Sequence, residues 1–477
     1  MSVSTGKPIL INGQWIKTSI LESVRSPYSG DLLATVCQAE PQHIDGTIQM
    51  MKQAARELAA VPAHGRARAL VHIADGIAAR HEEFAQTLSG EAGKPLTDAR
   101  REIDRGIQTF RLAAEESTRI SGETIPMDLT PGGEAYTATV KRFPLGPVLG
   151  ITPFNFPLNL VAHKMAPCFA AGNPFVLKPA PQTPLTALLL GEVFLRTDLP
   201  PTALTILPCS NALAERMVEH PVFQALSFTG SMTVGWMLKG KAGYKRTLLE
   251  LGGNAGVIIE PDADLETAVT RCVTGGFGYA GQTCISVQRI FVHQSHYDQF
   301  LQSFIEKVQM LATGDPALET TVVGPLINEQ AAIRVETWIQ EAVSQGATLH
   351  TGGNRQRSVM EPTVLTNVSS TMKVCCEEIF GPVVTISPYT TLQEALDRMN
   401  DTPFGLQAGI FTQNIDAMYR AYANLEVGAV LVNEIPTFRA DHMPYGGVKQ
   451  SGLGREGVRY AIQELTEPKL LIVKSPT

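Results

Sequence analysis

From residue 147 onward, short apolar runs alternate with longer stretches in which apolar residues recur at helical spacing. This alternation is typical of parallel sheets, because each crossover between parallel strands needs a connection long enough for a helix. We therefore expect an α/β fold with a doubly wound parallel sheet in this part of the chain. The predicted strands span 148–151, 175–178, 204–207, 225–228 and 247–251, and the predicted helices between them span 158–171, 185–195, 212–219 and 232–239.

A second alternating series begins after Cys284 and predicts a second α/β domain. Neither series has a fixed repeat period, so a solenoid is not indicated. The predicted strands of the second series span 287–292, 383–386, 409–412 and 429–432, and its helices span 297–311, 328–345, 392–399 and 415–423.

The segment 41–121 has the apolar spacing of three helices, and the pattern of the second helix reaches Phe84. The third helix, predicted over 100–120, carries arginines such as Arg105 on its polar faces, where a solvated side chain is the ordinary case. After this helix, residues 135–143 alternate like an antiparallel pair of strands.

The last apolar stretch, 462–473, is expected to form a strand with no obvious partner in its own domain. A terminal strand of this kind often pairs across a subunit boundary, because its open edge offers unpaired backbone groups. We therefore expect a homo-oligomer, either a dimer or a tetramer.

Length and charge narrow the class of protein. A chain of 477 residues is long enough for two or three domains, and a net charge of -7 disfavours nucleic acid as a partner. No apolar stretch is long enough to cross a membrane, and residues 1–20 lack the pattern of a signal peptide, so a cytoplasmic location is expected. The seven cysteines show no CxxC spacing, which argues against a disulfide framework and against a bound metal.

The sequence Gly281-Gln282-Thr283-Cys284 follows a glycine-rich run, 275–281. Small residues around a cysteine can leave room for a substrate to approach the sulfur, and the thiolate is the reactive form. The ordinary alternative is a buried structural cysteine, so Cys284 needs supporting residues before it is assigned a reaction.

Several strand ends carry groups suited to a ligand. Phe228-Thr229-Gly230-Ser231 joins a strand to a helix, where Gly230 permits close approach and Ser231 can cap the helix. The GxGxxG fingerprint is absent, so nucleotide binding stays open at this point. Lys178 ends the neighbouring strand and could bond a ribose, although a solvated lysine is the ordinary case.

Two further strand-end residues suit acyl chemistry. Glu250 ends the predicted strand 247–251 and could act as a general base. Asn155 lies between two prolines in Pro153-Phe154-Asn155-Phe156-Pro157, which fix the loop, and its amide could donate to an oxyanion. The ordinary alternatives are a strand-end carboxylate without a catalytic role for Glu250 and a turn residue for Asn155.

Taken together, the motifs PFNFP, KPA, FTGS, LELGG, GQTC, EEIFGPV and MPYGGVKQSGLGREG resemble those of the NAD(P)-dependent aldehyde dehydrogenase superfamily, in the same order and along nearly the whole chain. The resemblance implies two doubly wound parallel-sheet domains and an oligomerisation arm built from a hairpin and the C-terminal strand. The implied parts are a cofactor domain over 1–122 and 145–254, a catalytic domain over 255–450, and an arm over 123–144 and 451–477.

The resemblance also implies roles for individual residues. Cys284 looks like the nucleophile, Glu250 like the base, and Asn155 like the oxyanion donor beside the Cys284 backbone amide. These roles imply oxidation of a small aldehyde to its carboxylic acid through a thiohemiacetal and a thioester. The positions implied to bind NAD or NADP are Thr152, Pro153, Phe154, Lys178, Gly230, Ser231, Val234, Leu251, Glu378 and Phe380.

The chain departs from the family pattern in two places. Pro181 stands where many members have a glutamate that grips the adenosine ribose, so the choice between NAD and NADP is open. Cys209-Ser210 replaces a common Pro-Gly pair, which suggests a differently shaped adenine pocket.

The chain looks closest to the branch that acts on lactaldehyde, phosphonoacetaldehyde and glyceraldehyde 3-phosphate. Arg105 and Arg439 are the candidates for holding an anionic tail. Thr283 precedes the nucleophile where some phosphonate-active relatives have arginine, which weakens the phosphonoacetaldehyde option. The alternatives are a CoA-acylating semialdehyde dehydrogenase, a cofactor-independent thioesterase, and a non-catalytic binding protein with the same fold.

Overall fold

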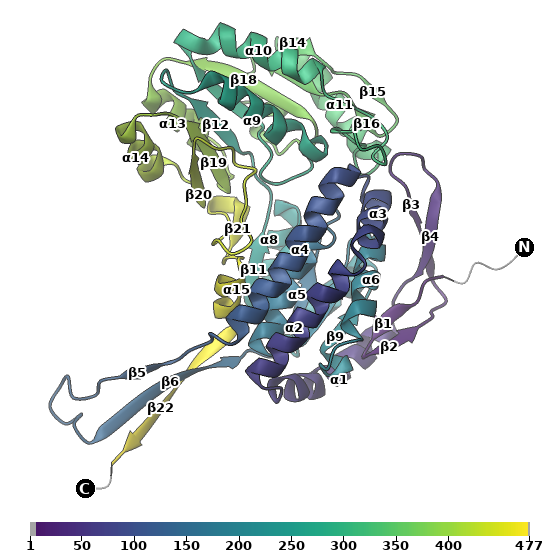
Figure 1. Cartoon of the computed structure of the whole chain (residues 1–477), viewed down its shortest axis with the longest axis vertical. Helices are drawn as coiled ribbons and strands as arrows, with labels where there is room; N and C mark the ends of the chain where they lie inside the picture. The colour runs from purple at the N-terminus through teal and green to yellow at the C-terminus, as the bar shows by residue number, and fades with distance from the viewer. Residues whose placement is uncertain (1–5, 476–477) are drawn as a thin grey trace, which may run out of the picture.

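A computed structural model describes residues 6–475 and contains two large sheets, one above the other in Figure 1. The first has eight strands in the order β2-β1-β9-β8-β7-β10-β11-β21, and its central five strands are parallel. The strands are β1 Ile9–Ile11, β2 Gln14–Ile16, β7 Val148–Ile151, β8 Phe175–Lys178, β9 Leu204–Ile206, β10 Ala225–Thr229, β11 Arg246–Glu250 and β21 Gly452–Leu453. The doubly wound parallel sheet predicted from the sequence is confirmed.

Helices cover this first sheet. α5 is buried along its whole length, because it lies against the sheet and is covered by α2, α4 and α15. The helices of this half are α1 Pro41–Ala59, α2 Ala63–Ala78, α3 His81–Ala92, α4 Leu96–Ser117, α5 Asn159–Ala171, α6 Pro184–Phe194, α7 Asn211–Glu219 and α8 Met232–Ala242. A short hairpin, β3 Leu21–Arg25 and β4 Leu32–Cys37, packs beside α3.

The opening helical segment contains four helices, so the prediction of three was wrong. The apolar pattern that reaches Phe84 continues across a break at Ala79 and Arg80, where α2 ends and α3 begins. Phe84 and the apolar face of α2 are buried in the same core cluster, which explains why the break leaves no trace in the periodicity.

The second sheet has seven strands in the order β14-β17-β18-β13-β12-β19-β20, with β14 antiparallel to its neighbour. Its strands are β12 Gly256–Ile259, β13 Arg289–His293, β14 Thr348–Thr351, β17 Thr363–Thr366, β18 Val383–Tyr389, β19 Gln407–Phe411 and β20 Ala429–Val432. Its helices are α9 Leu265–Phe277, α10 Tyr297–Gln309, α11 Glu329–Ser344, α12 Lys373–Cys376, α13 Leu392–Asn400 and α14 Ile415–Asn424. A two-stranded ribbon, β15 Arg355–Gln356 and β16 Val359–Met360, lies beside α11.

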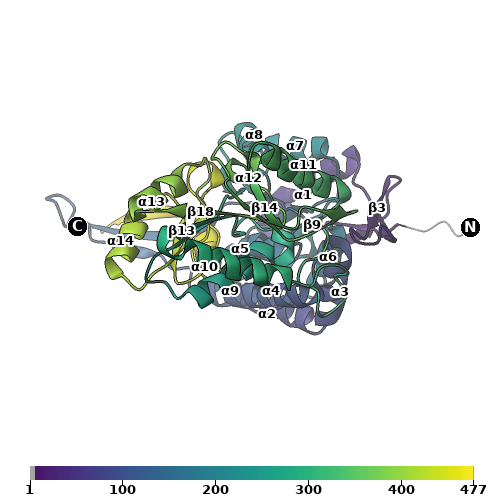
Figure 2. The same cartoon turned by 90° about the horizontal axis from the view of Figure 1, so that it is seen from above.

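A three-stranded arm projects from the body of the molecule, at the end opposite β3 (Figures 1 and 2). Its strands are β5 Glu123–Ile125, β6 Tyr136–Pro144 and β22 Thr466–Lys474, in the order β22-β6-β5. The segment 135–143 therefore forms one strand, paired on both edges, and not the predicted strand pair.

The prediction of a strand over 462–473 was wrong for its first residues. Residues 462–464 belong to α15, Val458–Glu464, because Ile462 is buried in the core cluster that α5 also joins. The strand itself begins at Thr466 and pairs with β6 of the same chain, while its other edge has no partner among the described strands. Among residues 6–475, no helix is long and apolar enough to cross a membrane.

The buried side chain of Asn173 joins the arm to the first sheet. The Oδ1 atom of Asn173 accepts from the N–H of Gly146 at 2.8 Å, and its Nδ2 donates to the carbonyl of Leu465 at 2.8 Å. The amide therefore fixes the chain where it enters β7 and where it leaves α15 for the arm.

We expect Asn173→Ala to destabilise the protein by about 2 to 4 kcal/mol, because two backbone groups lose their partner in a buried place. The urea midpoint of unfolding measures this. The matched control is Asn424→Ala, which removes an exposed side chain bonded to the carbonyl of Arg420 and should change the stability by less than about 0.5 kcal/mol. Equal urea midpoints for the two variants would contradict the proposed role of Asn173 in joining the arm to the first sheet.

Candidate active site

A cavity of about 590 Å³ lies where the first sheet faces the second. Its wall is formed by residues that directly follow three adjacent parallel strands, β7, β10 and β11, and by loops of the second half of the chain. Carboxyl ends of parallel strands are the usual ligand-binding edge of an open α/β sheet, and the predicted site was placed there. The cavity brings Asn155, Glu250 and Cys284 together.

Cys284 is half-buried and lines this cavity. The preceding turn is strained, because Tyr279 and Ala280 have left-handed backbones with φ of 50° and 53°, which costs on the order of 1 to 2 kcal/mol for each residue. Gly281 also has a positive φ, and a Cβ atom there would lie 2.3 Å from the carbonyl oxygen of Gly381. The turn thus holds the nucleophile loop in one fixed conformation.

The glycine-rich run supplies open space in part: Gly278 lines the cavity, and a Cβ atom there would meet no atom within 4 Å. The other glycines of the run are closely packed. Gly275 and Gly276 lie in the last turn of α9, where a Cβ atom on either would come within 2.7 Å of a neighbouring side chain. Their small size allows close packing of α9 beneath Cys284, and access to the sulfur comes from the cavity.

Asn155 is buried and its Nδ2 atom donates to the carbonyl of Gln282 at 3.0 Å. This bond ties its loop to the nucleophile loop and leaves one amide hydrogen available. The backbone N–H of Cys284 has no acceptor among residues 6–475. The two groups can therefore serve as a pair of donors to an oxyanion.

Glu102 supports the loop of Asn155 from behind. Its Oε1 atom accepts from the N–H groups of Leu158 and Asn159 at 2.9 and 3.1 Å. Its other oxygen pairs with Lys94, whose buried ammonium also lies 3.6 Å from the centre of the Phe156 ring. This contact fixes the start of α5 and, with it, the direction of the asparagine loop.

Glu250 is buried, and its Oε2 atom has no partner among the described residues. Burial, and after it the charge of Glu456, raises the pKa of Glu250 well above its usual range. Although burial also acts on Glu456, Lys164 and Arg439 lower the pKa of that carboxyl to about 2. Glu250 therefore holds its proton more tightly than Glu456, and it becomes a base as the pH rises through its pKa.

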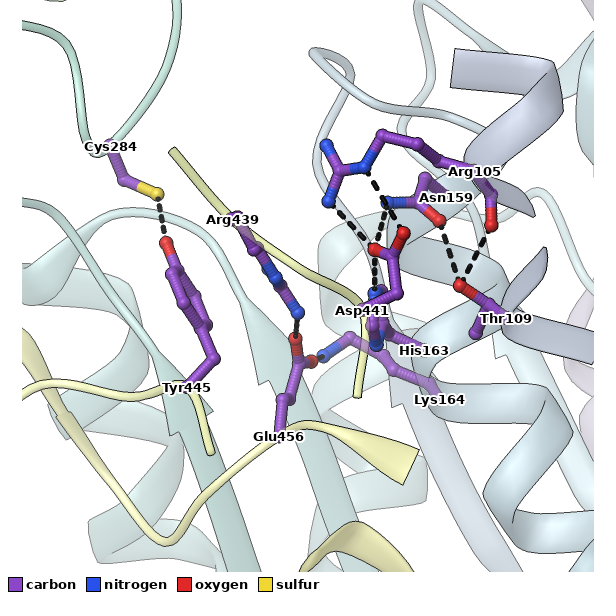
Figure 3. A network of polar contacts seen from close by, with 10 residues as sticks. All are labelled: Arg105, Thr109, Asn159, His163, Lys164, Cys284, Arg439, Asp441, Tyr445 and Glu456. Carbon is purple, nitrogen blue, oxygen red and sulfur yellow. Dashed lines mark hydrogen bonds and ion pairs between the residues drawn. The ribbon is translucent and has the colours of Figure 1, made fainter. Parts of the chain in front are cut away.

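The Cys284 sulfur lies 3.1 Å from the hydroxyl oxygen of Tyr445 (Figure 3). Burial raises the pKa of the Cys284 thiol to about 12, and the contact with Tyr445 acts in the opposite direction. The resting sulfur at neutral pH is therefore protonated, and it needs a base or a nearby positive charge for activation.

Most of the predicted cofactor residues line the same cavity. Pro153, Phe154, Gly230, Ser231, Leu251, Glu378 and Phe380 are among them. Ser231 is the N-cap residue of α8, but its side chain makes no capping bond, so the predicted cap is absent and the first N–H groups of the helix stay available. The hydroxyl of Thr229 is also buried there and has no partner in the described part of the chain, which fits a phosphate group.

Glu378 and Phe380 lie on the opposite wall. The Oε1 atom of Glu378 accepts from the N–H of Gly253 at 2.9 Å, and burial raises the pKa of this carboxyl to about 7. The rings of Phe154 and Phe380 meet edge to face at 5.9 Å. This combination of a carboxylate and aromatic edges suits a ribose with an attached flat ring.

Three predicted cofactor residues lie outside the cavity wall. Thr152 is buried, and Lys178 is buried with its Nζ atom 3.4 Å from Oδ1 of Asn211. Val234 lies on the first turn of α8 with 39% of its surface exposed. Their contacts with a cofactor remain a prediction.

Both predicted anion-binding arginines line the cavity, and each is held by a carboxylate (Figure 3). Arg105 on α4 uses Nη2 and Nε to bond Asp441, at 2.7 and 3.3 Å. Arg439 bonds Glu456 through Nη2 at 2.9 Å and lies over the Tyr445 ring, while its buried Nε has no partner among residues 6–475.

The sequence analysis assigned no role to Tyr445, Glu456 or Lys164. The first two lie in the stretch MPYGGVKQSGLGREG, which contributed only to the resemblance. Lys164 had a usable signal, because it is a lysine in the middle of the mostly apolar predicted helix 158–171.

Comparisons with known proteins agree with this geometry. Residues 15–471 match the model of the aldehyde dehydrogenase family. The chain is 41% identical over 466 residues to a 3-sulfolactaldehyde dehydrogenase of Priestia megaterium, covering 98% of this chain and 97% of the relative. It is similar to the crystal structure of aldehyde dehydrogenase 21 from Physcomitrella patens in complex with the reaction product succinate, with 43% identity, a TM-score of 0.96 and 98% of each chain covered.

A further similar structure is the glyceraldehyde-3-phosphate dehydrogenase GapN of Methanocaldococcus jannaschii complexed with NADP. It shares 36% identity and a TM-score of 0.92, and the match covers 96% of this chain and 100% of the other.

The raised pKa of Glu250 predicts how ester turnover depends on pH. With p-nitrophenyl acetate, which needs no cofactor to acylate Cys284, the hydrolysis of the acyl-enzyme should increase with pH as Glu250 ionises, well above the usual carboxyl range. Glu250→Gln should remove this increase of the hydrolysis rate with pH and lower turnover by about 10²-fold.

Glu456→Gln should shift the increase of the hydrolysis rate to lower pH. The substitution removes the negative charge that raises the pKa of Glu250, and it leaves the cations in place. An unchanged pH profile in both variants would contradict the assignment of Glu250 as the base.

Proposed function

Since this chain belongs to the aldehyde dehydrogenase family, we propose that it oxidises a short aldehyde with an anionic tail to the corresponding carboxylic acid. As a member, it is an NAD(P)-dependent oxidoreductase for small aldehydes. The proposal concerns the tail of the substrate and the roles of the individual residues.

We assign the chemistry to the three residues that meet at the cavity. The Cys284 sulfur attacks the carbonyl carbon, and the Asn155 amide with the Cys284 N–H stabilises the oxyanion that forms. When bound, NAD or NADP accepts the hydride that leaves this carbon. Glu250 then takes a proton from water, which attacks the thioester, so the acid and the free thiol are released.

The observation that carries the tail assignment is the unpartnered Nε atom of Arg439, buried beside the cavity. A buried N–H donor without an acceptor is costly, and an anionic oxygen from the substrate would satisfy it. Arg105 and Arg271 also line the cavity, whereas their partners Asp441 and Glu434 do not. The cations therefore face the substrate, and the carboxylates lie behind them.

The named relatives agree in the chemistry of their substrates. Sulfolactaldehyde, the succinate product and glyceraldehyde 3-phosphate each carry an anionic group a few bonds from the reacting carbon. A common feature of this kind supports an anionic tail in preference to a neutral one.

We further propose that NADP is accepted as well as NAD. Pro181 offers no carboxylate to repel a 2′-phosphate, and the similar GapN structure holds NADP. The first sheet, with residues 1–122 and 145–254, would form the cofactor domain, and residues 255–450 would form the catalytic domain.

We propose that the arm, 123–144 with 451–477, joins copies of this chain. The apolar residues Leu470 and Leu471 on β22 are half or more exposed, and the outer edge of this strand is unpaired among the described residues. β20 forms another open edge at the end of the second sheet. Open apolar edges are stable when another strand covers them, so a homo-oligomer is expected. We also propose that the protein is located in the cytoplasm, as predicted from the sequence.

The experiment that tests the function is a panel of short aldehydes assayed with NAD and with NADP, with and without CoA. Succinic semialdehyde and 3-sulfolactaldehyde should give higher kcat/KM than neutral propanal, and the product should be the free acid in the presence of CoA. Cys284→Ser should abolish turnover and keep cofactor binding. An acyl-CoA product would favour the CoA-acylating alternative.

Arg105→Gln tests the tail contact. We expect kcat/KM for the anionic aldehydes to fall by about 10- to 100-fold, because a hydrogen bond to a charged group is lost, with little change for propanal. The control is Arg111→Gln, an exposed arginine on the same helix that pairs with Asp75 and lies outside the cavity wall. Equal losses for anionic and neutral aldehydes would remove Arg105 from this role.

Leu471→Lys tests the arm as an interface. A charge on the exposed strand should shift the protein to a lower mass in light scattering, because burying an unpaired lysine opposes association. Leu318→Lys, in an exposed loop outside the arm, should leave the mass unchanged. A wild-type monomer would contradict the proposed oligomer.

A further inference from the structure

We propose that Tyr445 is a further catalytic residue, which donates a hydrogen bond to the Cys284 thiolate, and that Arg439 positions its ring. The inference rests on the proposed function only in taking Cys284 as the nucleophile. It starts from the distance of 3.1 Å between the phenol oxygen and the sulfur, the atom that reacts (Figure 3).

The hydroxyl of Tyr445 has no other partner among residues 6–475, and the side chain is only 3% exposed. A buried hydroxyl costs free energy unless it makes a hydrogen bond, and a phenylalanine would fill the same space without that cost. The sulfur contact is therefore the one observed use of this oxygen.

The direction of the bond follows from the charge of the sulfur. Either atom can donate while Cys284 is a thiol, but a thiolate has no hydrogen, so only the phenol can then donate. Burial, with the charges of Cys284 and Glu250, raises the pKa of Tyr445 well above its usual value. The phenol therefore holds its proton more tightly than a free tyrosine, and no proton is transferred to the sulfur.

The backbone of Tyr445 is held in place on both sides. Its N–H donates to the carbonyl of Glu456 at 3.1 Å, and the N–H of Glu456 donates back to the carbonyl of Tyr445 at 2.7 Å. This reciprocal pair sets the tyrosine ring and the Glu456 carboxylate side by side. The pair fixes the backbone from which the ring projects, and burial of the side chain limits its rotation.

Arg439 occupies the space between these two side chains. Its guanidinium carbon lies 3.7 Å from the centre of the Tyr445 ring, and its Nη2 atom bonds Glu456 at 2.9 Å. Glu456 is held in turn by Lys164 at 2.9 Å. A cation over the ring withdraws electron density from it, which makes the phenol a stronger donor. Arg439 therefore acts on the sulfur through Tyr445, in addition to the direct effect of its charge on Cys284, while its Nε atom remains available to the substrate.

The size of the effect follows from two opposing trends. A hydrogen bond to a charged group stabilises the thiolate, so its population at a pH below the thiol pKa increases by about 10- to 100-fold. A thiolate of lower pKa is less nucleophilic, and this offsets about half of the gain on a logarithmic scale. The net gain in reaction rate is about 3- to 10-fold.

Alkylation of Cys284 by iodoacetamide tests the proposal in the full-length enzyme without aldehyde or cofactor. At each pH below the thiol pKa, Tyr445→Phe should react about 3- to 10-fold more slowly than the wild type. Arg439→Met keeps the phenol and removes the cation, so it should give a smaller loss in the same direction. The thiolate absorbance, with Cys284→Ser as the blank, should show a higher thiol pKa in Tyr445→Phe.

Two controls separate the hydrogen bond from loosened packing. Tyr389→Phe removes a buried hydroxyl that bonds the carbonyl of Ile259 in the second sheet, outside the cavity wall, and should react like the wild type. Tyr445→Leu should lose as much rate as Tyr445→Phe, whereas it would react faster if the ring only shielded the sulfur. A wild-type rate in Tyr445→Phe, or an equal loss in Tyr389→Phe, would overturn the proposal.

This outcome is independent of the substrate. If the aldehyde panel shows no preference for anionic tails, the proposed function fails while the alkylation rates still decide the role of Tyr445. If the alkylation rates are unchanged, the anionic preference stands and Tyr445 serves only to pack the site.

Discussion

The carboxylate of Glu456 joins the separate parts of the chain that surround the reacting groups. It accepts from Lys164 of α5, which belongs to the first sheet, and from Arg439, which lies in the loop after the second sheet. Both cations and the carboxylate are almost completely buried. Buried charges need partners, and removal of Glu456 would leave two buried cations without the carboxylate that they share.

This cluster fixes the state of the two groups that act on a substrate. After burial, the negative charge of Glu456 opposes ionisation of Glu250 and raises the pKa of the general base. The positive charge of Arg439 lies on the ring of Tyr445, whose hydroxyl meets the Cys284 sulfur. Glu456 therefore affects Glu250 directly, and it affects Cys284 through Arg439 and Tyr445.

Asp441 is a second buried carboxylate, and it lies behind Arg105, which lines the cavity. It accepts from His163 and Arg105, at 2.9 and 2.7 Å, and these partners hold its pKa below the usual range against the effect of burial. Asp441 and Arg439 are two residues apart, so one short loop both supplies a cation and orients another. That loop therefore contributes to the positive charge of the cavity, whose wall also includes residues at the ends of β7, β10 and β11.

The sequence predicted the parallel strands well where a helix separates one strand from the next. β7 and β8 were predicted at both ends, since their flanking helices have a different periodicity. β12 was missed, because only the residues 251–255 separate it from β11 and no helix marks the passage to the second sheet. The end of α15 was predicted as strand, because its apolar residues fit both patterns and only packing against α5 decides between them.

The sequence by itself determined the α/β class, the strand ends that bear the reactive side chains and the identity of Asn155, Glu250 and Cys284 as candidates. These follow from periodicity and from motifs, which are local properties of the chain. The tertiary structure alone decided that Lys164, Arg439 and Tyr445 meet around Glu456. Such contacts join residues up to 292 positions apart, and the charge of a buried group depends on which neighbours the fold places beside it.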